Sequence, residues 1–171
     1  MKQNEVISRI LYCLCLILSA GYLAVFLYSL ICLLTGFATG LHTDHHNLHI
    51  NYPFTETSFL TIENTIPYII FSFLAVLLAY GIFFMLAAKV FRVFFRKRLF
   101  TEYNIIHLRR FYIYNIFFPL PLVLLAGCFT EVEKVIWGMV FIHFMLGIFC
   151  LFLANIFRQG LHLQNEQDLF I

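Results

Sequence analysis

The chain has 171 residues, of which 62% are hydrophobic and only 12% are charged. Soluble domains usually carry about a quarter charged residues, so this composition excludes an ordinary water-soluble domain and predicts an integral membrane protein. The five cysteines fall within apolar runs and show no metal-binding or disulfide spacing, so no disulfide framework is predicted.

Four stretches without Asp, Glu, Lys or Arg are long enough to cross a bilayer, which takes roughly 17–25 apolar residues. These stretches are residues 10–34, 66–88, 111–129 and 135–157. Each is predicted to be a helix, because lipid offers no water to satisfy open backbone groups. The expected fold is therefore a single all-α integral membrane domain over residues 1–171, a four-transmembrane-helix antiparallel bundle.

Basic residues are distributed unevenly over the segments that connect these spans. Only Lys134, of the 11 Lys and Arg residues, lies outside the N-terminus, the segment 89–110 and the segment 158–171. When acidic residues are also counted, one side of the membrane carries +6 and the other −4. The positive-inside rule then predicts that both termini are cytoplasmic, with an inner loop over 89–110, an inner tail over 158–171 and an outer loop over 35–65.

The outer loop contains a cluster of histidines with a helical spacing of i, i+3, i+4 and i+7. These are His42, His45, His46 and His49. On one helix face, and with the carboxylate of Asp44 nearby, such imidazoles could hold zinc, copper or nickel. A histidine cluster could also respond to pH, because its charge changes near pH 6.5.

A strand is the competing interpretation of the same loop. Apolar Leu48, Ile50, Tyr52 and Phe54 alternate with other residues, and the following "SFLTI" could pair with them in a short β-hairpin. His49 would then lie on the polar face, and the other three histidines would belong to a preceding turn. In that case the four rings do not share a face, and a solvated loop without metal is the third alternative.

The inner loop begins with basic residues that are predicted to continue the second helix to the level of lipid phosphates. These are Arg92, Arg96, Lys97 and Arg98. Anionic lipids favour each such residue by about 1 kcal/mol, although the residues could equally serve only to set the topology. Direct nucleic-acid binding is not expected from so short a basic segment without a DNA-binding fold.

The next helix is predicted to begin near Glu102. Thr101 suits the N-cap, and Glu102 places negative charge in the first turn, where it favours the helix dipole. Asn104 stands where a capping box prefers Glu or Gln. Further along, "FFPLPL" predicts a kink at Pro119, and His143 is expected to bond a neighbouring helix.

Two motifs stand out in the inner segments. "FTEYNIIHLRR" has the form Phe-Ser/Thr-x-x-Asn, three variable residues, then Leu-Arg, and the matching residues are Phe100, Thr101, Asn104, Leu108 and Arg109. The tail has the form Gly-x-x-Leu-x-x-Glu-Gln-Asp-Leu, and its residues are Gly160, Leu163, Glu166, Gln167, Asp168 and Leu169.

In both motifs and in its four spans, the chain resembles a bacterial membrane family catalogued as domain of unknown function 2975. Leu99 and Phe170 depart from that pattern, where the family usually has Pro and Thr. The resemblance implies a bacterial cytoplasmic (inner) membrane and no established activity. It also implies a neighbouring small helix-turn-helix regulator of the Cro/C1 type, which the motif residues would contact.

The tail itself has two interpretations. Gly160 could end or bend the last helix, and Glu166 and Asp168 could then fold back on the basic inner loop as an ion-pair clasp. Alternatively, the tail is a short linear motif for a soluble protein. Exposed ion pairs are worth only about 0–1 kcal/mol each, so a partner could displace such a clasp.

The functional hypothesis is a regulatory or signalling membrane protein. A small transporter, or a metal- or pH-responsive sensor that uses the outer histidines, is the alternative. A membrane enzyme is not expected, because no carboxylate pair or nucleophile–base pair is visible, and no cofactor is predicted. Whether the chain forms a homo-oligomer stays open, although Gly138, Gly147 and the Ala75–Ala79 pair would allow close helix contact.

Overall fold

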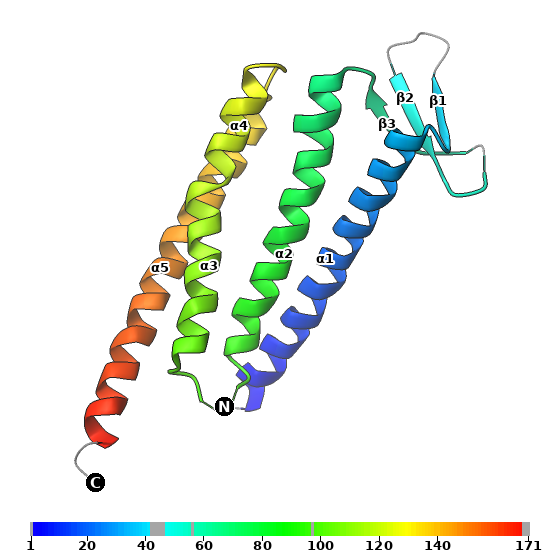
Figure 1. Ribbon diagram of the computed structural model, residues 1–171. Helices are drawn as coiled ribbons and strands as arrows, with labels where there is room; N and C mark the ends of the chain where they lie inside the picture. The colour runs from blue at the N-terminus through cyan, green and yellow to red at the C-terminus, as the bar shows by residue number, and fades with distance from the viewer. Residues whose placement is uncertain (1, 42–46, 56, 97, 169–171) are drawn as a thin grey trace.

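The computed structural model describes residues 2–41, 47–55, 57–96 and 98–168. The elements in chain order are α1 (Lys2–Thr35), β1 (Thr39–Leu41), β2 (Asn47–Asn51), β3 (Ser58–Glu63), the π-helix η1 (Tyr68–Leu74), α2 (Ala75–Val93), α3 (Glu102–Phe117), α4 (Pro119–Gly127) and α5 (Lys134–Asp168). Four helical segments are long and apolar enough to cross a membrane. The helices run side by side, with the sheet at one end and the start of α1 and end of α5 at the other (Figure 1).

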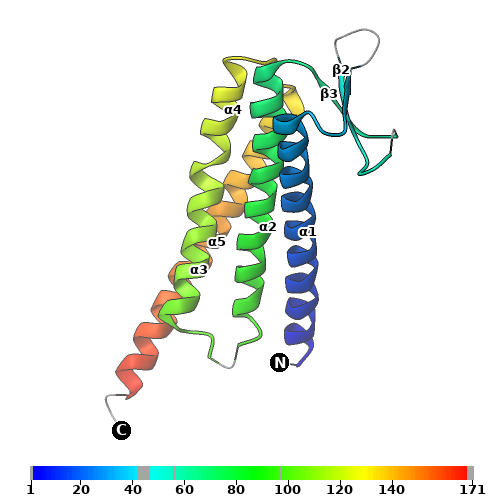
Figure 2. The same cartoon turned by 45° about the vertical axis from the view of Figure 1, so that its right-hand side comes forward.

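The helices pack as two pairs. α1 lies along α2, α5 lies along α3, and the pairs join mainly through α2 and α3 (Figure 2). The Ser19 hydroxyl on α1 donates to the Gly81 carbonyl on α2 at 2.9 Å. On the other pair, a Cβ at Gly147 would lie 2.6 Å from the Ile116 side chain, so glycine permits this close approach. Gly138, which the sequence offered for the same purpose, has no atom of another element within 4 Å of that position.

The third apolar segment is divided at Pro119, as the sequence predicts. α3 ends at Phe117, and α4 starts with Pro119 in its first turn. Proline lacks the N–H that would continue the backbone ladder, and its ring collides with the preceding turn. The break follows the C-terminal end of α3, so this helix is uninterrupted from Glu102 to Phe117 and includes the motif residues Asn104, Leu108 and Arg109.

A three-stranded antiparallel sheet in the order β1–β2–β3 forms between α1 and η1. β2 pairs with β3 in a register that places His49 opposite Thr61. Ile50 and Ile62 are buried beside Cys32 of α1, so the apolar face of the sheet covers the end of that helix. The alternation of apolar residues around Ile50 therefore predicted β2 correctly. No pattern in the sequence predicted β1.

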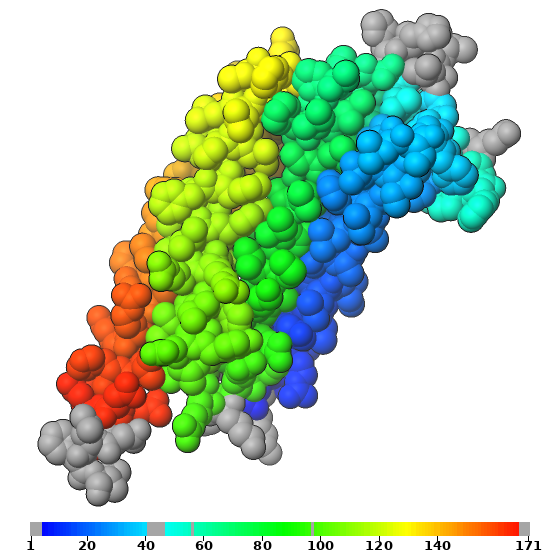
Figure 3. Space-filling view, in the orientation of Figure 1, coloured from blue at the N-terminus to red at the C-terminus, as the bar shows by residue number. Residues whose placement is uncertain are grey.

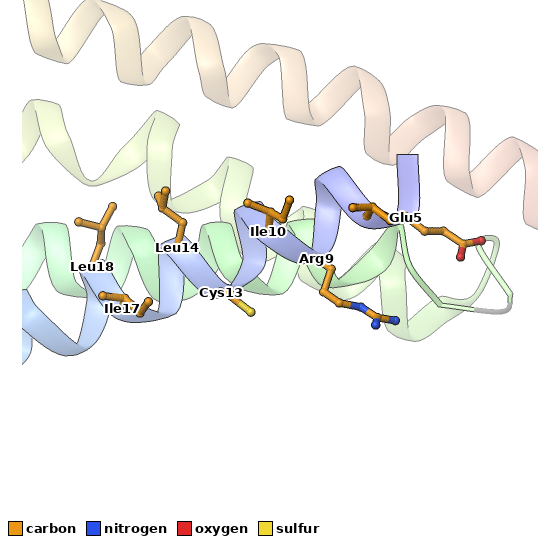
Figure 4. Close-up of a pocket in the computed structure, with 8 residues that line it drawn as sticks. Glu5, Arg9, Ile10, Cys13, Leu14, Ile17 and Leu18 are labelled. Atoms are coloured by element: carbon orange, nitrogen blue, oxygen red, sulfur yellow. The ribbon is translucent and has the colours of Figure 1, made fainter. Parts of the chain in front are cut away.

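Most apolar side chains in the long helices face outwards. Ile17 on α1 is 72% exposed and Phe149 on α5 is 67% exposed. A hollow of about 920 Å³ lies along α1. The residues that line it, drawn in Figure 4, are Glu5, Val6, Arg9, Ile10, Cys13, Leu14, Ile17 and Leu18. Such outward apolar surface is what lipid chains would cover. None of the motif residues lines this hollow.

α5 differs from the expected tail. It is one helix of 35 residues and passes through Gly160 without ending there. The interpretation in which the helix ends at this glycine is therefore wrong. At a rise of 1.5 Å per residue it is about 50 Å long, roughly 20 Å more than the hydrocarbon core of a bilayer.

Candidate functional site at the basic end

The start of α1, the end of α2, the start of α3 and the end of α5 lie at the same end of the helices, which we call the basic end (Figure 1). Lys89, Arg92, Arg96, Arg98, Arg109, Arg110 and Arg158 all belong to its segments. Both sequence motifs also belong to it, one at the start of α3 and the other on the last turns of α5.

Thr101 caps α3, as the sequence predicts. Its backbone is extended, with φ −139° and ψ 149°, and its hydroxyl accepts from the Asn104 amide N–H at 3.3 Å. Such a cap satisfies one of the N–H groups that have no partner at a helix start. The cap thereby fixes where α3 begins.

Asn104 holds the preceding loop in place. Its side-chain amide donates to the carbonyls of Leu99 at 2.8 Å and Arg98 at 3.2 Å. The residue is fully buried, so these bonds are made away from water. Among the described residues its Oδ1 has no hydrogen-bond partner. An amide at this position can donate twice to the loop, which the carboxylate of a capping-box Glu cannot do.

Phe100 joins the two motifs. Its ring lies directly against Gly160, where a Cβ would approach ring atoms to 2.7 Å. The same ring packs edge-on against Phe157, with the centroids 5.4 Å apart. About two turns before Phe157 on α5, the Cys150 thiol donates to the carbonyl of the fully buried Leu108 at 3.6 Å. The start of α3 is therefore braced against α5 through two residues of the first motif, Phe100 and Leu108.

The outward residues of the two motifs form a different group. Arg109 is exposed, and Leu163 on the last part of α5 is 61% exposed. Glu166 and Gln167 are exposed as well. Asp168 is the last residue of α5, and Leu169 lies outside the described residues. In Figure 3 the last part of α5 that is visible lies at the edge of the molecule, beside the start of α3.

The ion-pair clasp, in which the tail folds back on the basic inner loop, does not match the structure of α5. α5 continues as one helix to Asp168, so the chain does not turn back towards the basic loop before that residue. The carboxylate of Glu166 lies 3.3 Å from His162 Nδ1 on the same helix, one turn away. An i, i+4 pair of this kind supports the helix itself. The acidic residue therefore stays on an extended helix.

The structure describes only one of the four histidines in the segment between α1 and η1. His42, His45 and His46 lie outside the described residues. The Nδ1 atom of His49 is 2.8 Å from the Thr61 hydroxyl and 3.1 Å from the Ser58 hydroxyl. Because His49 lies on β2, the strand alternative describes this residue and the helical alternative is wrong. Within the described ranges no three His, Cys, Asp or Glu side chains are placed to hold a metal ion.

His143 bonds a neighbouring helix, as expected. Its Nδ1 lies 2.8 Å from Asn115 Oδ1 on α3, while the Asn115 amide donates to the Phe111 carbonyl. The amide oxygen is an acceptor, so His143 carries its proton on Nδ1. His143 also lines a cavity of about 210 Å³ between α2, α3, α4 and α5, together with Tyr80 and Tyr114. No sequence pattern predicted this cavity.

Comparison with known proteins adds one match. No curated protein and no solved structure matches the chain. The family model described as "Protein of unknown function (DUF2975)" matches residues 42–171, a range that holds both motifs of the basic end. The match covers three quarters of the chain and agrees with the resemblance in the two motifs. The chain therefore belongs to the DUF2975 family.

Proposed function

We propose that this protein crosses a bacterial inner membrane four times, with its basic end in the cytoplasm, and that it docks a soluble regulator there. The uneven placement of Lys and Arg supports this orientation. The proposed role is regulatory and not enzymatic. A small helix-turn-helix transcription factor is the first candidate partner, because the family resemblance implies such a neighbour.

The contact between Phe100 and Gly160 is the observation that carries the proposal. This contact holds the loop before α3 against the C-terminal part of α5, which extends beyond the length needed to cross a bilayer. A helix that is braced at its base presents its outer face in a fixed position, so less conformational entropy is lost when a partner binds. That outer face carries Leu163 and Glu166.

The chemistry of this face suits a basic, partly apolar surface on the partner. Leu163 is a single exposed apolar residue that could enter a pocket, and Glu166 supplies negative charge one turn further on. Central apolar anchors with charged residues around them are the usual arrangement of small interfaces. Helix-in-groove binding would use both residues, since i and i+3 lie on one face.

The test is a pull-down of detergent-solubilised protein from the cells that produce it. Replacement of both Leu163 by Ser and Glu166 by Gln is expected to abolish recovery of a DNA-binding partner that the unchanged protein retains. Asn165→Ala is the matched control, because Asn165 is exposed on the same turns but faces away from Leu163. Equal recovery by the double variant and the control would refute this docking surface.

A further inference from the structure

His107 is a buried side chain whose hydrogen-bonding groups are unused. It is 9% exposed, and among the described residues neither ring nitrogen has a hydrogen-bond partner. Its ring packs edge-on against Tyr103, with the centroids 4.3 Å apart. Buried polar groups in proteins are normally hydrogen-bonded, so an unpartnered imidazole requires an explanation.

The charged groups that act on His107 are all cations. They are Lys89 and Arg92 near the end of α2, Arg96 in the following loop and Arg110 on α3. Arg96 also stacks over the Tyr103 ring, with its guanidinium carbon 4.3 Å from the centroid. Within the described part of the chain, no carboxylate forms an ion pair with any of the four.

Four like charges around a buried ring are unfavourable without an anion. Lys89 is half-buried, which limits the screening of its charge by water. The group lies at the cytoplasmic limit of the proposed spans, where lipid phosphates are found. Basic pockets between helices on this side of a membrane are a known way to hold phosphate headgroups.

We propose that Lys89, Arg92, Arg96, Arg110 and His107 form a binding site for a phosphate group, carried by an anionic lipid headgroup or by a soluble phosphate compound. The proposal goes beyond the docking of a regulator and does not depend on it. Guanidinium groups bind phosphate oxygens through two parallel N–H donors, and Lys adds a point charge. A neutral His107 adds one ring N–H donor.

A phosphate reaches the ring when the side chains around it move aside. Arg and Lys side chains are long and unbranched, and Arg92 and Arg110 are exposed. Such movement needs no change in the backbone of α2 or α3. The expected ligand-bound state therefore has the same helices, with the guanidinium groups gathered on the phosphate.

The test measures binding of phosphatidylglycerol and of phosphatidylcholine to the full chain in detergent by native mass spectrometry. The unchanged protein is expected to prefer phosphatidylglycerol. Replacement of both Arg92 and Arg110 by Gln should lower the affinity for that lipid at least about tenfold. The matched control replaces Arg98 and Arg109 by Gln, which removes the same charge from residues outside the group that acts on His107.

The control should retain the preference for phosphatidylglycerol. His107→Phe keeps the four cations but removes the ring N–H donor, and it should weaken the binding of phosphatidylglycerol several-fold. Thermal unfolding without added lipid shows that each variant is folded. A second experiment adds inorganic phosphate or glycerol phosphate at millimolar concentration to the lipid-bound protein. Displacement of the lipid would identify a soluble phosphate compound as the ligand of the site. No displacement would identify the lipid headgroup as the ligand. Equal losses in the two double variants, or no lipid preference at all, would overturn the site.

Discussion

The ring of Phe100 occupies the space that a side chain at Gly160 would need, with ring atoms 2.7 Å from the position of its Cβ. Phe100 precedes the cap of α3, and Gly160 lies in the last third of α5. The two residues are the first of their respective motifs. Their contact explains physically why an aromatic residue and a glycine occur at these positions, since only glycine leaves room for the ring.

We expect Gly160→Ala to displace Phe100 and to destabilise the protein by about 1–3 kcal/mol, as overpacking does in other cores. The added methyl group would lie within 2.9 Å of Cδ1, Cε1 and Cγ of the ring, so the whole ring must leave its χ1 rotamer or the backbone must shift. Thermal unfolding in detergent, followed by circular dichroism, measures the effect.

Gly138→Ala is the matched control for this prediction. Gly138 lies on the same helix, and no atom of another element lies within 4 Å of its Cβ position. Alanine also has a higher helix propensity than glycine, so this variant should lose no stability. If both variants had the same melting temperature as the unchanged protein, Phe100 would not be packed on Gly160 as described.

The cap at Thr101 provides a second prediction. Thr101→Ala removes the hydroxyl that accepts from the Asn104 N–H, and the expected cost is about 1 kcal/mol. Thr101→Ser keeps a hydroxyl in the same place and should retain most of the stability. Hydrogen exchange at the first turn of α3 should increase in the alanine variant alone, and faster exchange in the serine variant too would argue against the cap.

The bond between His143 and Asn115 provides a third prediction. Asn115→Leu leaves the imidazole without its acceptor, and His143→Phe leaves the amide oxygen without its donor. Each single change should destabilise by about 1–2 kcal/mol, since a polar group left unpaired costs more than the bond itself contributes. The double variant removes both groups and should cost less than the sum of the single changes. Additive costs in this cycle, measured by unfolding, would show that the two residues are not coupled.

Much of the architecture could be predicted because its causes are local. Four apolar runs predict four long helices, Thr101 has the chemistry of a cap, and Pro119 lacks the N–H that would continue α3. The alternation around Ile50 predicts a strand in the same way. In each case the physical reason lies within a few residues of the sequence.

The site could be predicted only in part, because it depends on contacts between distant segments. Many helices end at a glycine, so the sequence allowed an end or a bend at Gly160, whereas the packing of Phe100 explains the presence of this glycine inside α5. His107 gave no signal, since neither its burial nor the cations around it are visible in a local pattern. Contacts of this kind follow from how α2, α3 and α5 pack.

The orientation of the basic end is the central claim, and cysteine labelling in intact cells tests it most directly. Cys13, Cys15, Cys32, Cys128 and Cys150 are first replaced by Ser or Ala, and a single cysteine is then placed at Phe54 or at Leu163. Both positions are suitable because Phe54 is 95% exposed beside the sheet and Leu163 is 61% exposed on α5. With a membrane-impermeant maleimide, we predict labelling of Phe54→Cys in intact cells and of Leu163→Cys only after permeabilisation. Labelling of Leu163→Cys in intact cells would place the end of α5 outside the cell and contradict the account.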